Sequence, residues 1–162
     1  TLRAKQNIVL IGMPTSGKSS IGALLAKKTG RVLYDTDALT AAREQKSVPE
    51  IFALGGETAF RAAESRTVRE LARQTGCIIA TGGGTILSAE NVRLLKKNGK
   101  LFFLDRPLSL LSACDDRPLS SRRAELEKMF EKRRPLYLAA ADERISNDGK
   151  AEVAADKILE KL

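Results

Sequence analysis

The chain has 162 residues, the size of one domain with a substantial core, and 43% of them are hydrophobic, as is typical of globular proteins. Its formal net charge is +8, which fits either a nucleic-acid partner or lysines and arginines on polar helix faces that attract small anions. Histidine is absent, which excludes Ser-His-Asp and Cys-His catalysis and histidine-based zinc sites, so a general base has to be a carboxylate or a lysine.

The remaining composition narrows the class of partner. Aromatic residues make up only 4% of the chain and tryptophan is absent, so a base-stacking platform is poorly supplied and the small-anion interpretation is favoured over nucleic acid. No apolar run has the length of a membrane span and no secretory signal is visible, so we expect no membrane partner. Cys77 and Cys114 are too few for a disulfide framework and lack metal-ligand spacing, which favours a cytoplasmic protein.

Short apolar runs alternate with helical patterns along the chain. The apolar runs predict strands at residues 7–11, 32–34, 77–80, 101–104 and, more weakly, 143–146. The helical patterns cover residues 18–29, 38–45, 57–75, 88–97, 121–140 and 150–161. Strands that alternate with helices predict an α/β fold in which one parallel sheet carries helices on both faces, and residues 1–162 contain no linker that would divide them into two domains.

The segment between the first strand and the first helix carries the most specific motif. Residues Gly12–Ser19 fit G-x-x-x-x-G-K-[ST], the P-loop pattern, whose glycines let backbone N–H groups close around phosphate oxygens. The N-terminus of the following helix adds a partial positive charge. Lys18 can then reach the terminal phosphates and the Ser19 hydroxyl can bind Mg²⁺. The alternative, a glycine turn with a surface lysine, is disfavoured by the flanking strand and helix.

A P-loop enzyme also needs an acidic group near Mg²⁺, usually at the end of an apolar strand. Two predicted strands are followed by an aspartate, Asp35 and Asp105. By pattern alone Asp105 is favoured, because the apolar run before it is the clearer strand. Because Asp37 lies two residues after Asp35, these two carboxylates could divide the work, one at the water shell of the metal and one at a substrate hydroxyl. The alternative is that Asp35-Thr36-Asp37 begins a helix as its N-cap, a role compatible with the first.

Further candidates for ligand binding lie after the strand at 77–80 and in the helix at 57–75. The triple glycine Gly82–Gly84 allows close backbone approach to a ligand, although a flexible turn would have the same composition. Arg61 could bind a substrate carboxylate through two nitrogens, or it could pair with Glu64 three residues later on a helix surface.

Two arginines lie in segments that could approach a ligand. Arg117 is part of the long loop at 105–120 and could stabilise charge on a transferring phosphoryl group. Arg133 lies within a run of three cations just before Pro135. Taken singly, each of these arginines is better explained as solvated surface charge.

Taken together and in order, these segments resemble the shikimate kinase family. The matching pieces are Gly12–Ser19, Asp35-Thr36-Asp37, Gly56-Glu57-x-x-Phe60-Arg61-x-x-Glu64, Gly82-Gly83-Gly84, Arg117-Pro118-Leu119 and Arg133-x-Pro135-Leu136-Tyr137. The resemblance implies a three-layer α/β/α P-loop kinase fold whose five parallel strands have the order 2-3-1-4-5. It also implies one domain over 1–162, with a P-loop region at 7–30, a substrate-binding region at about 35–64 and a lid at about 106–122.

Members of this family transfer the γ-phosphoryl group of ATP to the 3-hydroxyl of shikimate in aromatic amino-acid synthesis, with Mg²⁺ as cofactor. The resemblance implies that the phosphates are held by Thr15, Ser16, Gly17, Lys18, Ser19, Ser20 and Arg117. Mg²⁺ would lie at Ser19 and, through water, at Asp35. Asp37 would hydrogen-bond the attacking hydroxyl as the candidate base, and Lys18 and Arg117 would be the other catalytic residues. Shikimate would be bound by Asp37, Arg61, Gly82, Gly83, Gly84 and Arg133.

The chain departs from the family pattern on its nucleotide side. The lid between Asp105 and Arg117 is several residues shorter than usual and lacks the arginine that commonly stacks on adenine, and Thr15 replaces the common Gly or Ala. We expect these departures to affect nucleotide binding more than the shikimate pocket. We expect a cytoplasmic monomer whose partners are the small molecules shikimate and ATP. The alternatives are a kinase of another small hydroxy acid, such as gluconate, and a basic nucleotide-dependent RNA-binding protein.

Overall fold

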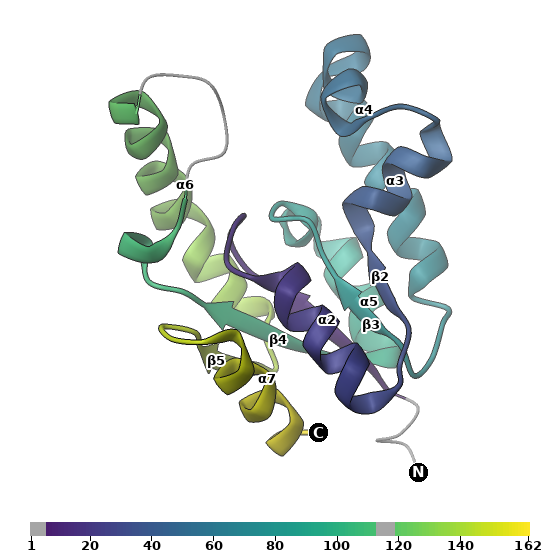
Figure 1. Cartoon of the computed structure of the whole chain (residues 1–162). Coiled ribbons are helices and arrows are strands. Elements are labelled where there is room, and N and C mark those ends of the chain that lie inside the picture. Colours follow the sequence, from purple (N-terminus) through teal and green to yellow (C-terminus); the bar gives the residue numbers. More distant parts are fainter. Residues whose placement is uncertain (1–5, 113–118) are drawn as a thin grey trace.

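The computed structural model describes residues 6–112 and 119–162, and within them one parallel sheet forms the centre of the fold (Figure 1). Its strands are β1 (Asn7–Ile11), β2 (Leu33–Asp35), β3 (Ile78–Ala80), β4 (Gly99–Asp105) and β5 (Glu143–Ser146). They pair in the order β2-β3-β1-β4-β5, and every pairing is parallel. The predicted α/β class and strand order are therefore confirmed.

Helices connect the strands, as the alternating sequence pattern predicts. They are α2 (Lys18–Thr29), α3 (Thr36–Glu44), α4 (Val48–Leu71), α5 (Ala89–Asn98), α6 (Leu119–Ala140) and α7 (Ala151–Glu160). Two short 3₁₀ turns, η1 (Thr85–Leu87) and η2 (Leu108–Leu110), follow β3 and β4. Within the described residues, none of the helices is long and apolar enough to cross a membrane.

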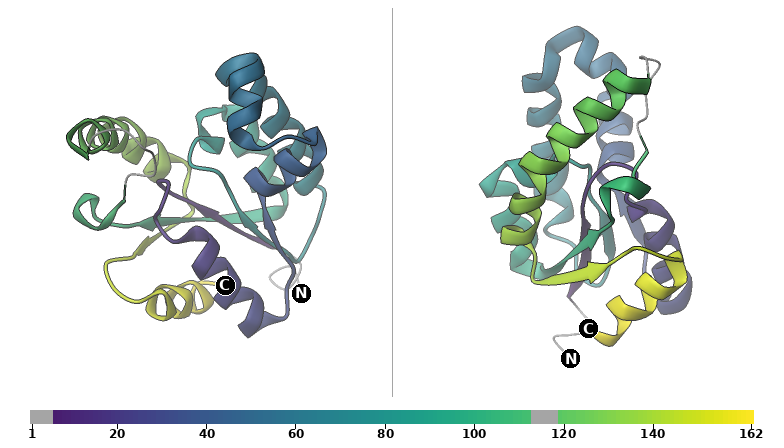
Figure 2. Two further views of the ribbon diagram at one scale, coloured as in Figure 1. Left: turned by 45° about the horizontal axis from the view of Figure 1, so that its top comes forward. Right: turned by 90° about the vertical axis from the view of Figure 1, so that its left-hand side faces the viewer.

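The sheet separates two hydrophobic cores because successive residues of a strand point to opposite faces. On one face, Val9 and Phe103 pack with residues of α4, α5 and α6. On the other face, Ile8 and Phe102 pack with residues of α2 and α7, two helices that lie side by side in Figure 2. The result is the three-layer α/β/α arrangement, with strands β1 and β4 buried on both faces.

Helix α4 begins earlier than the sequence analysis predicts. The predicted helix starts at residue 57, but α4 starts at Val48, after a capping box in which Ser47 and Glu50 hydrogen-bond each other's backbone N–H groups. The backbone kinks at Gly56, where φ is 73° and ψ is −170°. This conformation is essentially restricted to glycine, so Gly55 and Gly56 mark a bend within one helical segment and do not precede it.

The carboxyl edge of the sheet is where the topology favours a ligand site. The chain leaves β1 toward β2 on one side, whereas β4 and β5 lie on the other side of β1. In open α/β sheets, ligands bind at the carboxyl ends of the strands where the strand order reverses in this way. Figure 1 shows α6 and the α3–α4 pair rising on opposite sides of this edge, with the loop after β1 between them.

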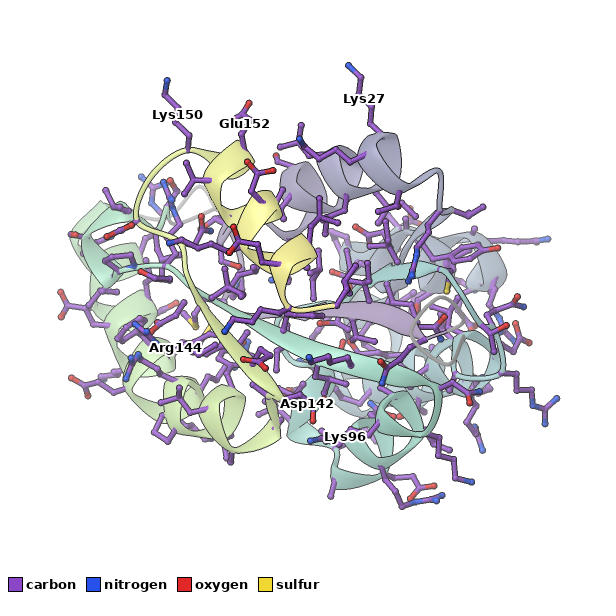
Figure 3. The ribbon with its side chains drawn as sticks, turned by 90° about the horizontal axis from the view of Figure 1, so that it is seen from below. Lys27, Lys96, Asp142, Arg144, Lys150 and Glu152 are labelled. Atoms are coloured by element: carbon purple, nitrogen blue, oxygen red, sulfur yellow. The ribbon has the colours of Figure 1, made fainter. Side chains whose placement is uncertain are left out.

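The opposite side of the molecule carries a mixture of charges. Figure 3, seen from below, shows Lys27, Lys150 and Glu152 projecting outward from α2 and from the start of α7. Lys96 and Asp142 lie together there, with 3.3 Å between the ammonium nitrogen and a carboxylate oxygen. Interspersed charges of both signs are typical of solvated helix faces.

Candidate active site

The loop after β1 has the backbone of a phosphate-binding loop. Gly12 (φ 153°) and Gly17 (φ 95°) adopt conformations that L-residues rarely reach, and Gly17 is the N-cap of α2. Lys18 follows as the first residue of α2. Its ammonium group donates hydrogen bonds to the carbonyl oxygens of Gly12 and Met13, both at 2.8 Å. The lysine therefore folds back over the loop that would surround a phosphate.

The unusual residue in this loop is Thr15. Its φ is 65°, a left-handed conformation that is a genuine outlier for a β-branched side chain. The Thr15 hydroxyl donates to the carbonyl oxygen of Ser112 and accepts from the Ser112 N–H, each at 3.0 Å. Thr15 thus joins the P-loop to the segment that leaves η2, a contact that the common Gly or Ala could not make.

Burial controls the charge of Lys18. The side chain is buried, and the loss of solvent lowers the pKa of Lys18 to about 8, although the nearby carboxylates of Asp37 and Asp35 act in the opposite direction. An ammonium that is poorly solvated, and whose pKa is therefore low, is strongly stabilised by an anion placed beside it. A polyphosphate in this loop would supply such an anion.

Asp35 is the N-cap of α3, the alternative considered for it from the sequence, and it also lies beside Ser19. One carboxylate oxygen accepts a hydrogen bond from the Ala38 N–H at 3.0 Å and so caps α3. The other accepts from the Ser19 hydroxyl at 3.3 Å. The cap therefore fixes the carboxylate in an orientation that faces the first turn of α2.

Asp105, the competing acidic residue, has a different role. Burial alone would raise the pKa of Asp105, but hydrogen bonds from Arg134 and Arg144 outweigh that effect and lower it. Arg134 donates to both carboxylate oxygens, at 3.2 and 2.8 Å, and Arg144 donates to one at 2.6 Å. Asp105 thus joins β4 to α6 and β5, and its charge is already compensated.

The triple glycine makes room for three different side chains. A Cβ on Gly82 would lie 2.6 Å from a carboxylate oxygen of Asp37, and one on Gly84 would overlap the Arg61 guanidinium. A Cβ on Gly83 would lie 2.8 Å from the Pro14 ring. None of the three has a positive φ, so close approach, and not turn conformation, explains why glycine occupies these positions.

A buried carboxylate holds Arg61 in place. Glu64 is 1% exposed and accepts a hydrogen bond from Arg61 at 2.9 Å. Its second oxygen accepts from the Thr85 hydroxyl at 2.9 Å, and the Thr85 carbonyl accepts from the Asn91 amide at 3.0 Å. The pairing of Arg61 with Glu64 is therefore part of a buried network and not a solvated surface pair, and it leaves the guanidinium at the edge of a pocket.

Two adjoining pockets lie at the carboxyl edge. The larger, of about 490 Å³, is lined by Pro14, Thr15, Gly17, Lys18, Ser19, Ser20, Asp35, Asp37, Thr81, Gly82 and Gly83. The smaller, of about 180 Å³, is lined by Pro14, Asp37, Val48, Phe52, Phe60, Arg61, Glu64, Gly82, Gly83, Gly84 and Arg133. Asp37 lines both, so its carboxylate lies where a group bound on the phosphate side would meet a group bound beside the two arginines.

The Asp37 carboxylate binds a proton more readily in its protein environment than it would in water. Burial raises the pKa of Asp37 first, and the negative charges of Asp35 and Glu64 raise it further, against the opposing effect of Lys18 and Arg61. A carboxylate with a raised pKa is a better proton acceptor, which is what a base for a hydroxyl group requires.

The structure brings most of the predicted site residues together. Those that line one or both pockets are Thr15, Gly17, Lys18, Ser19, Ser20, Asp35, Asp37, Arg61, Gly82, Gly83, Gly84 and Arg133. Ser16 lies in the same loop but is buried, and its hydroxyl has no hydrogen-bond partner among the described residues. Arg117 lies outside the described residues.

Comparison with known proteins identifies the family. The shikimate kinase family model matches residues 14–162. A shikimate kinase of Persephonella marina is 40% identical over 151 residues, covering 90% of this chain and 92% of that protein. The chain belongs to the shikimate kinase family. This confirms the family resemblance inferred from the motifs.

Solved structures agree with this shikimate kinase assignment. The shikimate kinase of Acinetobacter baumannii, solved in complex with shikimate, superposes with a TM-score of 0.89 at 32% identity and covers 99% of this chain and 96% of that one. The Aquifex aeolicus shikimate kinase gives a TM-score of 0.83 at 32% identity, covering 95% and 94%. The fold of this kinase therefore matches the family over nearly its whole length.

Several residues that line the pockets or support them have roles that were not predicted from the sequence. Val48 and Phe52 line the smaller pocket from the first turns of α4, and the Ser47-x-x-Glu50 capping box could have revealed that helix. Asn147 donates from its side-chain amide to the Ser16 carbonyl at 2.6 Å, across 131 positions of sequence. Only the fold brings such distant residues together.

Proposed function

We propose that this chain transfers the γ-phosphoryl group of ATP to the 3-hydroxyl of shikimate. The observation that carries the proposal is the position of Asp37, which lines both the phosphate-side cleft and the small pocket that contains Arg61 and Arg133. A direct transfer needs the two reacting groups within one site and little else from the protein except positioning and charge stabilisation.

The P-loop side is proposed to bind ATP. Backbone N–H groups from Thr15 to Ser20 and the N-terminus of α2 would surround the β- and γ-phosphates. Lys18 would exchange its two carbonyl partners for phosphate oxygens, which stabilise its charge better. Its charge would then offset the negative charge that spreads over the transferring group.

Ser19 and Asp35 are proposed to hold Mg²⁺, with Asp35 acting through water. Their oxygens are 3.3 Å apart, and no cluster of three acidic, histidine or cysteine side chains occurs among the described residues. Mg²⁺ in phosphoryl-transfer sites is typically held by one or two protein oxygens with phosphate and water, so this donor set fits the ion. The ion supplies charge neutralisation at the phosphates.

The small pocket is proposed to bind shikimate. Arg61 and Arg133 would pair with its carboxylate, since guanidinium groups match that geometry with two parallel hydrogen bonds. Gly82, Gly83 and Gly84 would bind the ring through backbone groups of the loop after β3. Asp37 would accept a hydrogen bond from the 3-hydroxyl and then its proton as the phosphoryl group departs from ATP.

Arg117 is proposed to act from the lid on the ATP phosphates. The support is its Arg-Pro-Leu motif together with the contact between Thr15 and Ser112, which joins the P-loop to the segment after η2. We further propose one domain over 1–162, with the P-loop region at 7–30, the substrate region at about 35–64 and the lid at about 106–122. A cytoplasmic monomer with no nucleic-acid or membrane partner completes the proposal.

An acceptor panel tests this function. ADP formation is measured with Mg-ATP and either shikimate, gluconate or no acceptor, and the product is examined by mass spectrometry and ³¹P NMR. We expect turnover with shikimate only and a phosphate on the 3-oxygen, and we expect Lys18→Ala to abolish it. Turnover with gluconate but not with shikimate would overturn the proposal.

A further inference from the structure

Tyr137 is a fully buried aromatic residue whose polar end reaches the active site. Its side chain comes from α6, is 0% exposed and stacks on Phe103 with ring centroids 5.2 Å apart. The hydroxyl group donates a hydrogen bond to the carbonyl oxygen of Gly83, in the loop after β3. The ring thus belongs to the core, while the hydroxyl lies behind the small pocket, against its lining residue Gly83.

Arg133 lies four residues before Tyr137 on the same helix, so the two side chains share one face of α6. The positive charges of Arg133 and Arg61 act to lower the pKa of the Tyr137 hydroxyl. Burial raises the pKa of Tyr137 to about 12 despite these opposing effects, so the hydroxyl keeps its proton and remains a donor at neutral pH. Independently, a Cβ on Gly83 would lie 3.3 Å from a terminal nitrogen of Arg133. The hydroxyl, the Gly83 carbonyl and the guanidinium therefore form one cluster.

This cluster sets the orientation of a peptide group in the pocket wall. The described chain contains no cis peptide bond, so the Gly83 carbonyl and the Gly84 N–H point in opposite directions across the peptide that joins them. With the carbonyl held by Tyr137 on the core side, the Gly84 N–H is directed away from that side. Both glycines and Arg133 line the small pocket.

We propose that Tyr137 is a positioning residue for shikimate, because its hydroxyl fixes the Gly83–Gly84 peptide and Arg133 in the arrangement that receives the carboxylate. This inference rests on the proposed function and adds a residue that touches neither substrate. A purely structural tyrosine would be replaceable by phenylalanine, since phenylalanine keeps the ring, the burial and the stacking on Phe103. The difference between the two side chains therefore isolates the positioning role.

The experiment compares Tyr137→Phe with Tyr34→Phe, which alters the other tyrosine of the chain, on β2 and absent from the lining of both pockets. We expect Tyr137→Phe to raise the KM and the Kd for shikimate about tenfold, because the Gly83 carbonyl beside Arg133 loses its donor. The KM for ATP and kcat should stay within about twofold of wild type, and Tyr34→Phe should leave all of these constants within about twofold.

A double-mutant cycle with Arg133→Lys provides a second readout. If Tyr137 acts through Arg133, the double variant should lose less shikimate affinity than the product of the two single losses. Independent losses would overturn the link to Arg133. An unchanged shikimate KM in Tyr137→Phe, or equal increases in the KM for both substrates, would overturn the positioning role. Wild-type enzyme without shikimate-dependent turnover would instead overturn the proposed function, and this role with it.

Discussion

At the scale of single residues, the site depends on side chains that pack closely against the glycines of the loop after β3. Gly82, Gly83 and Gly84 each face a different neighbour, and two of these neighbours, Asp37 and Arg61, have separate proposed roles. The sequence suggested either close backbone approach to a ligand or a flexible turn, and the structure shows close approach to protein side chains. It was not predictable that protein side chains, Asp37 and Arg61 among them, would occupy this space, because their positions depend on α3 and α4.

Gly84→Ala should displace Arg61, because the added methyl group would overlap its guanidinium. We expect the Kd for shikimate to rise about 10- to 100-fold, the equivalent of one charge-assisted hydrogen-bonded contact, with the Kd for ATP within about twofold. Isothermal titration with each ligand measures both. Gly149→Ala is the matched control, since a Cβ there meets nothing within 4 Å. Unchanged shikimate affinity in Gly84→Ala would show that Arg61 is not a ligand.

Lys18 should make ATP binding sensitive to alkaline pH. Its pKa of about 8 means that the free enzyme carries a charged ammonium below pH 8 and loses it above. Because phosphate binds the charged form, the Kd for ATP should be constant up to about pH 8 and then rise by at most tenfold per pH unit. In Lys18→Arg the guanidinium stays charged, so its affinity should be flat from pH 7 to 9.5. A flat wild-type profile would contradict the role.

At the scale of elements, the strands were more predictable than the helix ends. The sequence pattern located all five strands, most clearly β1, β3 and β4, because buried parallel strands need continuous apolar residues. The edge strands β2 and β5 are less buried and carry weaker patterns. The first turns of α4 were missed because Gly55 and Gly56 resemble a helix break, although Ser47 and Glu50 carry the start signal. The missed turns supply Val48 and Phe52 to the small pocket, so this error at one element also left the site incomplete.

The kink in α4 gives a prediction at this scale. Alanine at position 56 would be forced into a backbone region that glycine alone tolerates, so Gly56→Ala should lower the free energy of unfolding by about 1–3 kcal/mol. Urea denaturation followed by circular dichroism measures this difference. Gly149→Ala, where φ is not positive, should change the free energy by no more than about 0.5 kcal/mol. Equal effects of the two variants would show that the kink is not held in that conformation.

At the scale of the whole molecule, the sheet places two chemically different pockets side by side. The nucleotide half follows β1 and was visible from a contiguous motif, whereas the substrate half combines α3, α4, α6 and the loop after β3. Its residues are far apart in the sequence, and only the family resemblance connected them beforehand. Arg133 and Arg134 illustrate the limit: they are neighbours in the chain, yet one lines the pocket and the other pairs with Asp105.

Asp37 is proposed to serve the acceptor hydroxyl at the junction of the two pockets. The most direct measurement is kcat for shikimate-dependent ADP formation by Asp37→Asn, at saturating ATP and shikimate, with the Kd of each ligand measured in parallel. Because the amide is nearly isosteric but cannot accept the proton, we expect kcat to fall about 10²- to 10⁴-fold while the Kd for ATP stays within about threefold. A kcat within about threefold of wild type would contradict the claim.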